Sequence, residues 1–169
     1  MLNDESMTIY KKGEVRGKDD EMIALRGELD SLQARCVYLC SVLKGENDTA
    51  FQGVAEILEV VTGLIRCEAL CESMEFCGFF NLSDDELRQY SHNPKKYLGV
   101  DHYFLGANEN VCMAELNLLR TQIRACERVA VKAIKDCLDW GDCIKRILNR
   151  MSSAAYILML KLKKEEEGQ

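Results

Sequence analysis

Apolar residues recur every three or four positions along four long segments of this 169-residue chain. This spacing places apolar side chains on one face of an α-helix, and it differs from the strict alternation of a half-buried strand. The segments begin near Asp20, Phe51, Cys112 and Ile144. The apolar positions of the first segment are Met22, Leu25, Leu29, Leu32, Cys36, Leu39 and Leu43. Helices with one apolar face must cover it, so the pattern predicts a helical bundle.

Breaks in the periodicity set the expected helix ends. Gly45 interrupts the first pattern, and the second runs to about Glu72. The third helix is expected to continue to about Cys137. Gly141 should then separate it from the last helix, whose apolar positions extend to Leu162.

The stretch between the second and third long helices carries its own signals. Residues 74–82 are rich in aromatic and apolar side chains and predict a buried turn. Ser83 and Glu86 have the spacing of a capping box, which predicts a short helix over residues 84–90. Residues 97–110 contain Gly99, Gly106 and Asn108, and we interpret them as a loop long enough to carry function.

These elements predict an all-α fold, a five-helix up-and-down bundle of the ferritin-like kind. A single proline and an aromatic content of only 7% favour helices over strands. We expect an N-terminal extended segment over residues 1–19, one helical-bundle domain over residues 20–164, and a solvated tail over residues 165–169.

Charge and cysteine content limit the classes of partner and the compartment. The net charge of −6 argues against a nucleic-acid partner, because phosphate backbones require a basic face. No apolar run reaches about 18 residues, so no membrane span is expected. Nine cysteines, an odd number, fit free thiols better than a disulfide framework. With no signal peptide apparent, we expect a cytoplasmic protein, and association with a bacterial microcompartment stays open.

The third long segment carries a stripe of charged residues. Arg120, Arg124, Glu127 and Arg128 lie at positions i, i+4, i+7 and i+8 and therefore share one side of the helix. Three guanidinium groups within two turns suit a polyphosphate, because each presents a planar fork of donors. A solvated face with a local pair at Glu127 is the alternative reading.

Two further polar residues lie beside core positions. Asn149 in the last helix could form an interhelical hydrogen bond or contact a ligand. Asp30 follows the core residue Leu29, and it could be a surface charge or the partner of an arginine from elsewhere.

Two cysteine pairs have helical i, i+4 spacing, Cys36 with Cys40 and Cys67 with Cys71. Such spacing could hold a metal ion, but no histidine is near, and cysteine is a common small core residue. We therefore expect no metal site. A helical bundle that binds a metal ion through cysteines is kept as a functional hypothesis, ranked below the two that are given next.

Longer runs of residues resemble a known family. The runs 81–87, 91–98, 101–102, 116–121 and 148–153 resemble, in order and spacing, the ethanolamine-utilisation cobalamin adenosyltransferases. The resemblance covers about residues 8–162.

The chain is also similar to the wider propanediol-utilisation type of adenosyltransferase. Lys18 and the two aspartates after it match the start of that family's first helix, and Asp30 matches its Gly-x-x-Asp motif. The arginine stripe matches its Arg-Thr-x-x-Arg-x-x-Glu-Arg signature, and Asn149 opens its Asn-Arg-Leu-Ser segment.

This resemblance implies an enzyme that moves the adenosyl group of ATP to the cobalt of cob(I)alamin, with active sites between the subunits of a homotrimer. A dimer is the alternative. It implies that Arg120 pairs with Asp30 of the partner subunit and reaches the phosphates. It implies that Phe104, with Tyr103 as its neighbour, crowds the lower face of the corrin. The residues implied to contact ATP are Lys18, Arg124, Glu127, Arg128 and Asn149.

The resemblance further implies ATP, Mg²⁺ and cobalamin as ligands, and a cobalamin reductase and an adenosylcobalamin-dependent lyase as partners. Two positions depart from the family pattern. Residues 7–13 lack its Gly- and Thr-rich phosphate loop, and Ser153 replaces its carboxylate. A second hypothesis is therefore a non-catalytic protein of the same fold that binds or delivers adenosylcobalamin.

Overall fold

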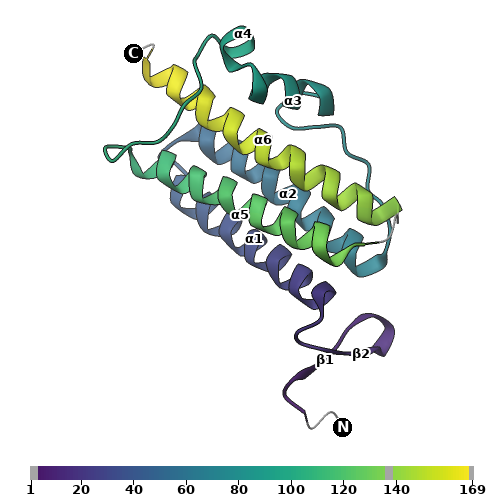
Figure 1. Cartoon of the computed structure of the whole chain (residues 1–169). Helices are drawn as coiled ribbons and strands as arrows, with labels where there is room; N and C mark the ends of the chain where they lie inside the picture. The colour runs from purple at the N-terminus through teal and green to yellow at the C-terminus, as the bar shows by residue number, and fades with distance from the viewer. Residues whose placement is uncertain (1–3, 136–138, 168–169) are drawn as a thin grey trace.

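The computed structural model describes residues 4–135 and 139–167, and most of them are helical (Figure 1). The described long helices are α1 (Glu21–Leu43), α2 (Asp48–Leu70), α5 (Val111–Ala133) and α6 (Asp139–Glu167). Two short helices, α3 (Asp84–His92) and α4 (Pro94–Leu98), lie between α2 and α5 in the chain. The predicted all-helical bundle is confirmed, and α4 is an additional short helix.

The four long helices form a ring in which α1 contacts α2 and α5, and α6 contacts the same two helices. The loop between α1 and α2 is short, so these neighbours are antiparallel. Asn110, which caps the start of α5, donates a 2.7 Å hydrogen bond to Glu166 near the end of α6. Thr49 at the start of α2 likewise donates to Glu165 near the end of α6, at 3.5 Å, so α1 and α6 run one way and α2 and α5 the other. The crossover from α2 to α5 carries α3 and α4 along α6 (Figure 1), which is the ferritin-like connection.

Each long helix contributes one apolar stripe to a shared core. All the predicted positions of α1 from Leu25 to Leu43 are buried, whereas Met22 is half-buried in the first turn. Burial of each such side chain contributes roughly 1.5–3 kcal/mol, which exceeds what helix propensity supplies. Among the described helices, none has a stretch apolar and long enough to cross a membrane.

The boundary between α5 and α6 differs from the prediction. The helix α5 ends at Ala133 rather than near Cys137, which lies outside the described residues. Gly141 does not separate the helices, because α6 already begins at Asp139. Gly141 is buried, and a Cβ there would lie 2.3 Å from Cγ2 of Ile134. The glycine therefore allows close packing rather than ending a helix.

The capping box at the start of α3 is confirmed. The backbone N–H of Ser83 donates to Glu86 Oε2 at 2.8 Å, and the N–H of Glu86 donates to Ser83 Oγ at 3.4 Å. Asp84 follows at the first helical position and forms ion pairs with Arg146 and Arg150 of α6. These pairs hold α3 against the outside of α6.

A short hairpin, β1 (Met7–Ile9) with β2 (Val15–Gly17), occupies the described part of the predicted N-terminal segment. Its buried Tyr10 donates a hydrogen bond to the carboxylate of Glu68 on α2, which is only 1% exposed. Lys11 and Arg26 approach the same carboxylate at 3.2 and 3.0 Å. Burial and the Glu68 carboxylate raise the pKa of Tyr10 to about 12. Glu68 therefore joins the hairpin to α1 and α2.

We predict that Glu68→Gln loosens the hairpin. The amide keeps the shape of the side chain but loses the charge that two cations and a phenol share, and hydrogen bonds to a charged group contribute about 1.5–3 kcal/mol. Backbone amides in β1 and β2 should exchange with solvent about tenfold faster or more, measured by hydrogen–deuterium exchange. Glu59→Gln, at an exposed position of α2, is the matched control. Equal exchange in both variants would contradict this role.

Candidate functional site

The apolar stripe of α5 determines where its arginines point. Leu116, Leu119 and Ile123 are fully buried, so residues at the intervening positions face the edge of the bundle. Arg120 is half-buried there, whereas Arg124 and Arg128 are exposed. The structure thus places the predicted arginines along one helix, next to α6 (Figure 1).

Arg120 is held by an amide rather than by a carboxylate. Its Nε and Nη2 donate to Asn117 Oδ1 at 3.1 and 2.9 Å. Burial, followed by the nearby charge of Arg124, lowers the pKa of the Arg120 guanidinium. No ion pair joins Arg120 to any described residue. No role for Asn117 was predicted from the sequence, although its i, i+3 spacing from Arg120 is the signal for this contact.

Glu127 and Asn149 meet across α5 and α6. Asn149 Nδ2 donates to Glu127 Oε1 at 2.7 Å, and Arg150 Nη1 donates to Asn149 Oδ1 at 2.7 Å. Arg150 in turn pairs with Asp84 of α3. Two of the predicted residues are therefore in direct contact, and a polar chain fixes the side chain of Asn149.

The loop between α4 and α5 brings Phe104 beside Arg120. The Phe104 side chain is 87% exposed, whereas Tyr103 and Leu105 are half-buried against the bundle. A pocket of about 220 Å³ lies at this place. It is lined by Tyr103, Phe104, Leu105, Asn117, Arg120, Tyr156 and Met159. An apolar loop and a guanidinium thus share one pocket.

Tyr103 turns its polar end inward. Its hydroxyl is buried near the Glu109 carboxylate. Burial and the Glu109 carboxylate raise the pKa of Tyr103 to about 12. The ammonium group of Lys163 lies 5.4 Å from its ring centroid. Tyr103 therefore packs on α6, while Phe104 projects away from it.

Two predicted residues lie apart from this group. Lys18 and Asp30 are exposed, the first in the turn before α1 and the second on α1. The backbone N–H of Lys18 donates to Ser6 O at 2.7 Å, but neither side chain forms a hydrogen bond or ion pair with a described residue. Within one chain, no described interaction joins Asp30 to Arg120.

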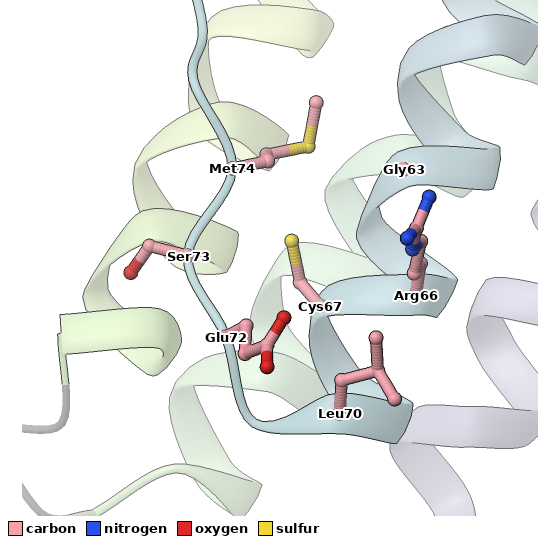
Figure 2. Close-up of a pocket in the computed structure, with 7 residues that line it drawn as sticks. All are labelled: Gly63, Arg66, Cys67, Leu70, Glu72, Ser73 and Met74. Carbon is pink, nitrogen blue, oxygen red and sulfur yellow. The ribbon is translucent and has the colours of Figure 1, made fainter.

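Another hollow, of about 330 Å³, lies at the end of α2 (Figure 2). Figure 2 shows Cys67 and Met74 pointing into the space between α2 and the segment after it. None of the predicted site residues lines this hollow. No cluster of three or more His, Cys, Asp and Glu side chains that could hold a metal ion occurs within residues 4–135 and 139–167.

Comparison with known proteins gives a consistent result. The sequence profile of a family described as cobalamin adenosyltransferase matches residues 2–162. The chain is 30% identical over 158 residues to the corrinoid adenosyltransferase EutT of Escherichia coli and 28% identical to that of Salmonella typhimurium. Each alignment covers 92% of this chain but only 58% of the relative. The chain thus spans about three fifths of the length of these relatives.

The fold is shared with solved structures of low sequence identity. A phenylalanine-to-alanine variant of a PduO-type ATP:corrinoid adenosyltransferase from Lactobacillus reuteri, complexed with cobalamin and ATP, matches with a TM-score of 0.75. The match covers 98% of this chain and 93% of the other, at 17% identity. A phenylalanine-to-histidine variant of that protein gives a TM-score of 0.73.

We predict that the arginine stripe binds polyphosphate. Arg124→Gln should raise the Kd for inorganic tripolyphosphate about tenfold, because one charge-assisted contact is lost. Isothermal titration calorimetry measures this constant. Arg88→Gln, an exposed arginine on α3, removes the same charge outside the stripe. If both substitutions weaken binding equally, only net charge matters and the stripe is not the site.

Proposed function

Since this chain belongs to the cobalamin adenosyltransferase family, we propose that it transfers the 5′-deoxyadenosyl group of ATP to cob(I)alamin. The observation that carries the proposal is the pocket in which Phe104 and Arg120 lie side by side. A flat apolar ligand requires an apolar surface and a triphosphate requires a cationic one, and this pocket offers both. The exposed Arg124 continues the cationic surface along α5.

The proposed reaction needs no protein base. The cobalt of cob(I)alamin supplies an electron pair to the 5′ carbon of ATP, so a Co–C bond forms while the bond from that carbon to the triphosphate oxygen breaks. Triphosphate leaves with the bonding electrons, and the cobalt becomes formally Co(III). The protein must align two substrates and stabilise the charge that grows on the leaving group. Fixed guanidinium groups suit the second task.

We propose that ATP contacts Lys18, Arg124, Glu127, Arg128 and Asn149. The contact between Glu127 and Asn149 fixes the asparagine amide for hydrogen bonding to the nucleotide. Mg²⁺ would enter with ATP and be held chiefly by the triphosphate, because the described residues offer no acidic cluster for it. Its role is to neutralise part of the triphosphate charge.

A second copy of the chain completes the proposed site. Arg120 lacks a carboxylate partner among the described residues, and Asp30 is an exposed carboxylate without a described partner. Pairing of Arg120 with Asp30 of the partner subunit would satisfy both charges. The exposed side chains of Val42 and Val111, which line one groove between α1 and α5, offer apolar surface for such an assembly. We propose a homotrimer, with a dimer as the alternative.

Phe104 has the role of crowding the lower face of the corrin. Its exposed ring can occupy the space of the lower axial ligand and exclude water from the cobalt. Loss of that ligand makes the preceding cob(II) state easier to reduce. A cobalamin reductase would supply the electron, and an adenosylcobalamin-dependent lyase would use the product. We propose a role in ethanolamine utilisation in the cytoplasm, with microcompartment association as an open extension.

A non-catalytic protein that holds or delivers adenosylcobalamin is the second candidate. Lys11, in the hairpin that stands where the family has its phosphate loop, is already engaged by Glu68 and Cys71. That lysine is therefore not free to bind a phosphate. This observation favours binding without transfer.

An absorbance assay separates the two candidates. Reduced cobalamin, ATP and Mg²⁺ are mixed anaerobically with the protein, and growth of the adenosylcobalamin spectrum is followed. We expect turnover by the unaltered chain and at least a hundredfold loss in Arg124→Ala, with helicity by circular dichroism unchanged, because about 3 kcal/mol of leaving-group stabilisation is removed. Binding of adenosylcobalamin without turnover would instead support the delivery protein.

We predict that Phe104→Ala lowers the rate by acting on cobalt coordination. Removing the ring should leave the KM for ATP within about twofold, since the ATP contacts are unchanged, while kcat falls at least tenfold. Steady-state kinetics with cobalamin and ATP varied separately give both constants. Val131→Ala, at an exposed apolar position on α5, is the control. An unchanged kcat in Phe104→Ala would remove the lower-ligand role.

A further inference from the structure

One hydroxyl on α6 holds the loop that carries Phe104. Tyr156 Oη accepts a hydrogen bond from the backbone N–H of Tyr103 at 3.0 Å and lies 3.2 Å from His102 Nδ1. The two rings of His102 and Tyr156 are nearly parallel, at 14°, with centroids 6.2 Å apart. Two successive loop residues therefore meet the same side chain immediately before Phe104.

The Tyr156 hydroxyl can serve both loop residues at once. The Tyr103 N–H is a donor, so it uses a lone pair of the Tyr156 oxygen. The Tyr156 O–H donates to His102 Nδ1 in the tautomer that carries the ring proton on Nε2, and in the other tautomer Nδ1–H donates to the second lone pair of the same oxygen. Each partner is satisfied once, and the arrangement fixes both the backbone and the adjacent side chain.

Other described contacts of this loop leave Phe104 untethered. The Asp101 side chain pairs with Lys95 of α4, and Gly106 N–H donates to Glu109 within the loop. Among the described hydrogen bonds, only those to Tyr156 join residues 99–105 to a long helix. The Tyr156 hydroxyl therefore supplies the hydrogen bonds that hold the loop to the bundle beside Phe104, in addition to the packing of Tyr103 and Leu105 on the core.

Tyr156 also borders the cationic half of the site. It lines the same pocket as Phe104 and Arg120, and its proximity acts to raise the Arg120 pKa against the larger effect of burial. A side chain at this place can fix the distance between the apolar loop and the guanidinium, which is the distance that two substrates must match.

We propose that Tyr156 is a positioning residue whose hydroxyl sets the projection of Phe104 over the corrin pocket. The inference rests on the proposed function for the identity of the ligand. It predicts that the hydroxyl matters only through Phe104. A Phe at position 156 would keep the ring and its packing while releasing the loop.

The test is Tyr156→Phe, compared with Tyr97→Phe. Tyr97 also donates its hydroxyl to a side chain, Gln89, at 2.9 Å, but it lies on α4 away from the pocket. The first readout is the electron paramagnetic resonance spectrum of cob(II)alamin bound together with ATP, which reports the fraction of cobalt without a lower ligand. Loss of one hydrogen bond should reduce the ratio of ligand-free to ligated cobalt about two- to tenfold in Tyr156→Phe. Tyr97→Phe should match the unaltered protein.

A double-mutant cycle tests the route through Phe104. In the Phe104→Ala background, Tyr156→Phe should change neither this ratio nor kcat, because the group being positioned is gone. Equal effects of Tyr156→Phe with and without Phe104 would overturn the proposal, as would an unchanged spectrum in the single variant. A merely structural role would lower stability without this dependence.

The outcome also separates this inference from the proposed function. If the unaltered protein binds cob(II)alamin and the ratio falls in Tyr156→Phe, positioning holds even where no adenosyl transfer occurs. If transfer occurs but the ratio and kcat do not depend on the hydroxyl, positioning is wrong and the transferase stands. If no cob(II)alamin binds, both are overturned.

Discussion

The packing of α5 against its neighbours is the constraint on which the candidate site depends. Leu116, Leu119 and Ile123 are fully buried, and a rotation of the helix by one residue, about 100°, would carry them to solvent. The same rotation would drive a guanidinium into the core, where an unpaired charge is very unfavourable. The direction of Arg120 and Arg124 is therefore a consequence of the apolar stripe. This explains how the proposed surface site for anions can be precise without being built on a loop.

One buried charge has counter-ions within the chain, whereas another, half-buried, charge has none among the described residues. Glu68 is surrounded by Lys11, Arg26 and the hydroxyl of Tyr10, so its charge is compensated within the chain. Arg120 has only the amide of Asn117, and burial lowers its pKa. A compensated charge fastens elements together, as at the hairpin. A charge left without a counter-ion keeps its electrostatic capacity for something outside the chain, whether a triphosphate or a carboxylate of a second copy.

The helices were predictable because their signals are local. Periodicity located the core face of α1, and the Ser83–Glu86 spacing located the start of α3. The predicted end of α5 was wrong, and so was the prediction that Gly141 separates α5 from α6. Gly141 acts through a tertiary contact with Ile134, which residue spacing does not reveal. The hairpin was missed for a similar reason, since its strands are short and it is held by Glu68, far away in sequence.

The candidate site was predictable in its types of residue but not in its connections. The i, i+4 spacing put Arg120 and Arg124 on one side of a helix, but no local pattern indicates that Glu127 meets Asn149. Tyr156 was missed altogether, because an aromatic residue in an apolar run reads as core. Its hydroxyl meets His102 and Tyr103 only when the loop between α4 and α5 packs on α6.

The exposure of Phe104 follows from the way this loop is tied down. Tyr103 and Leu105 on either side are half-buried against the bundle, whereas Phe104 between them is turned outward and is 87% exposed. Leaving a phenylalanine in water forgoes roughly 1.5–3 kcal/mol of burial. A loop free to twist would recover part of that energy by turning the ring inward. Hydrogen bonding of the Tyr103 N–H to Tyr156 opposes the twist and keeps an apolar surface available beside a cation. A flat apolar ligand and a polyanion bound side by side would cover both.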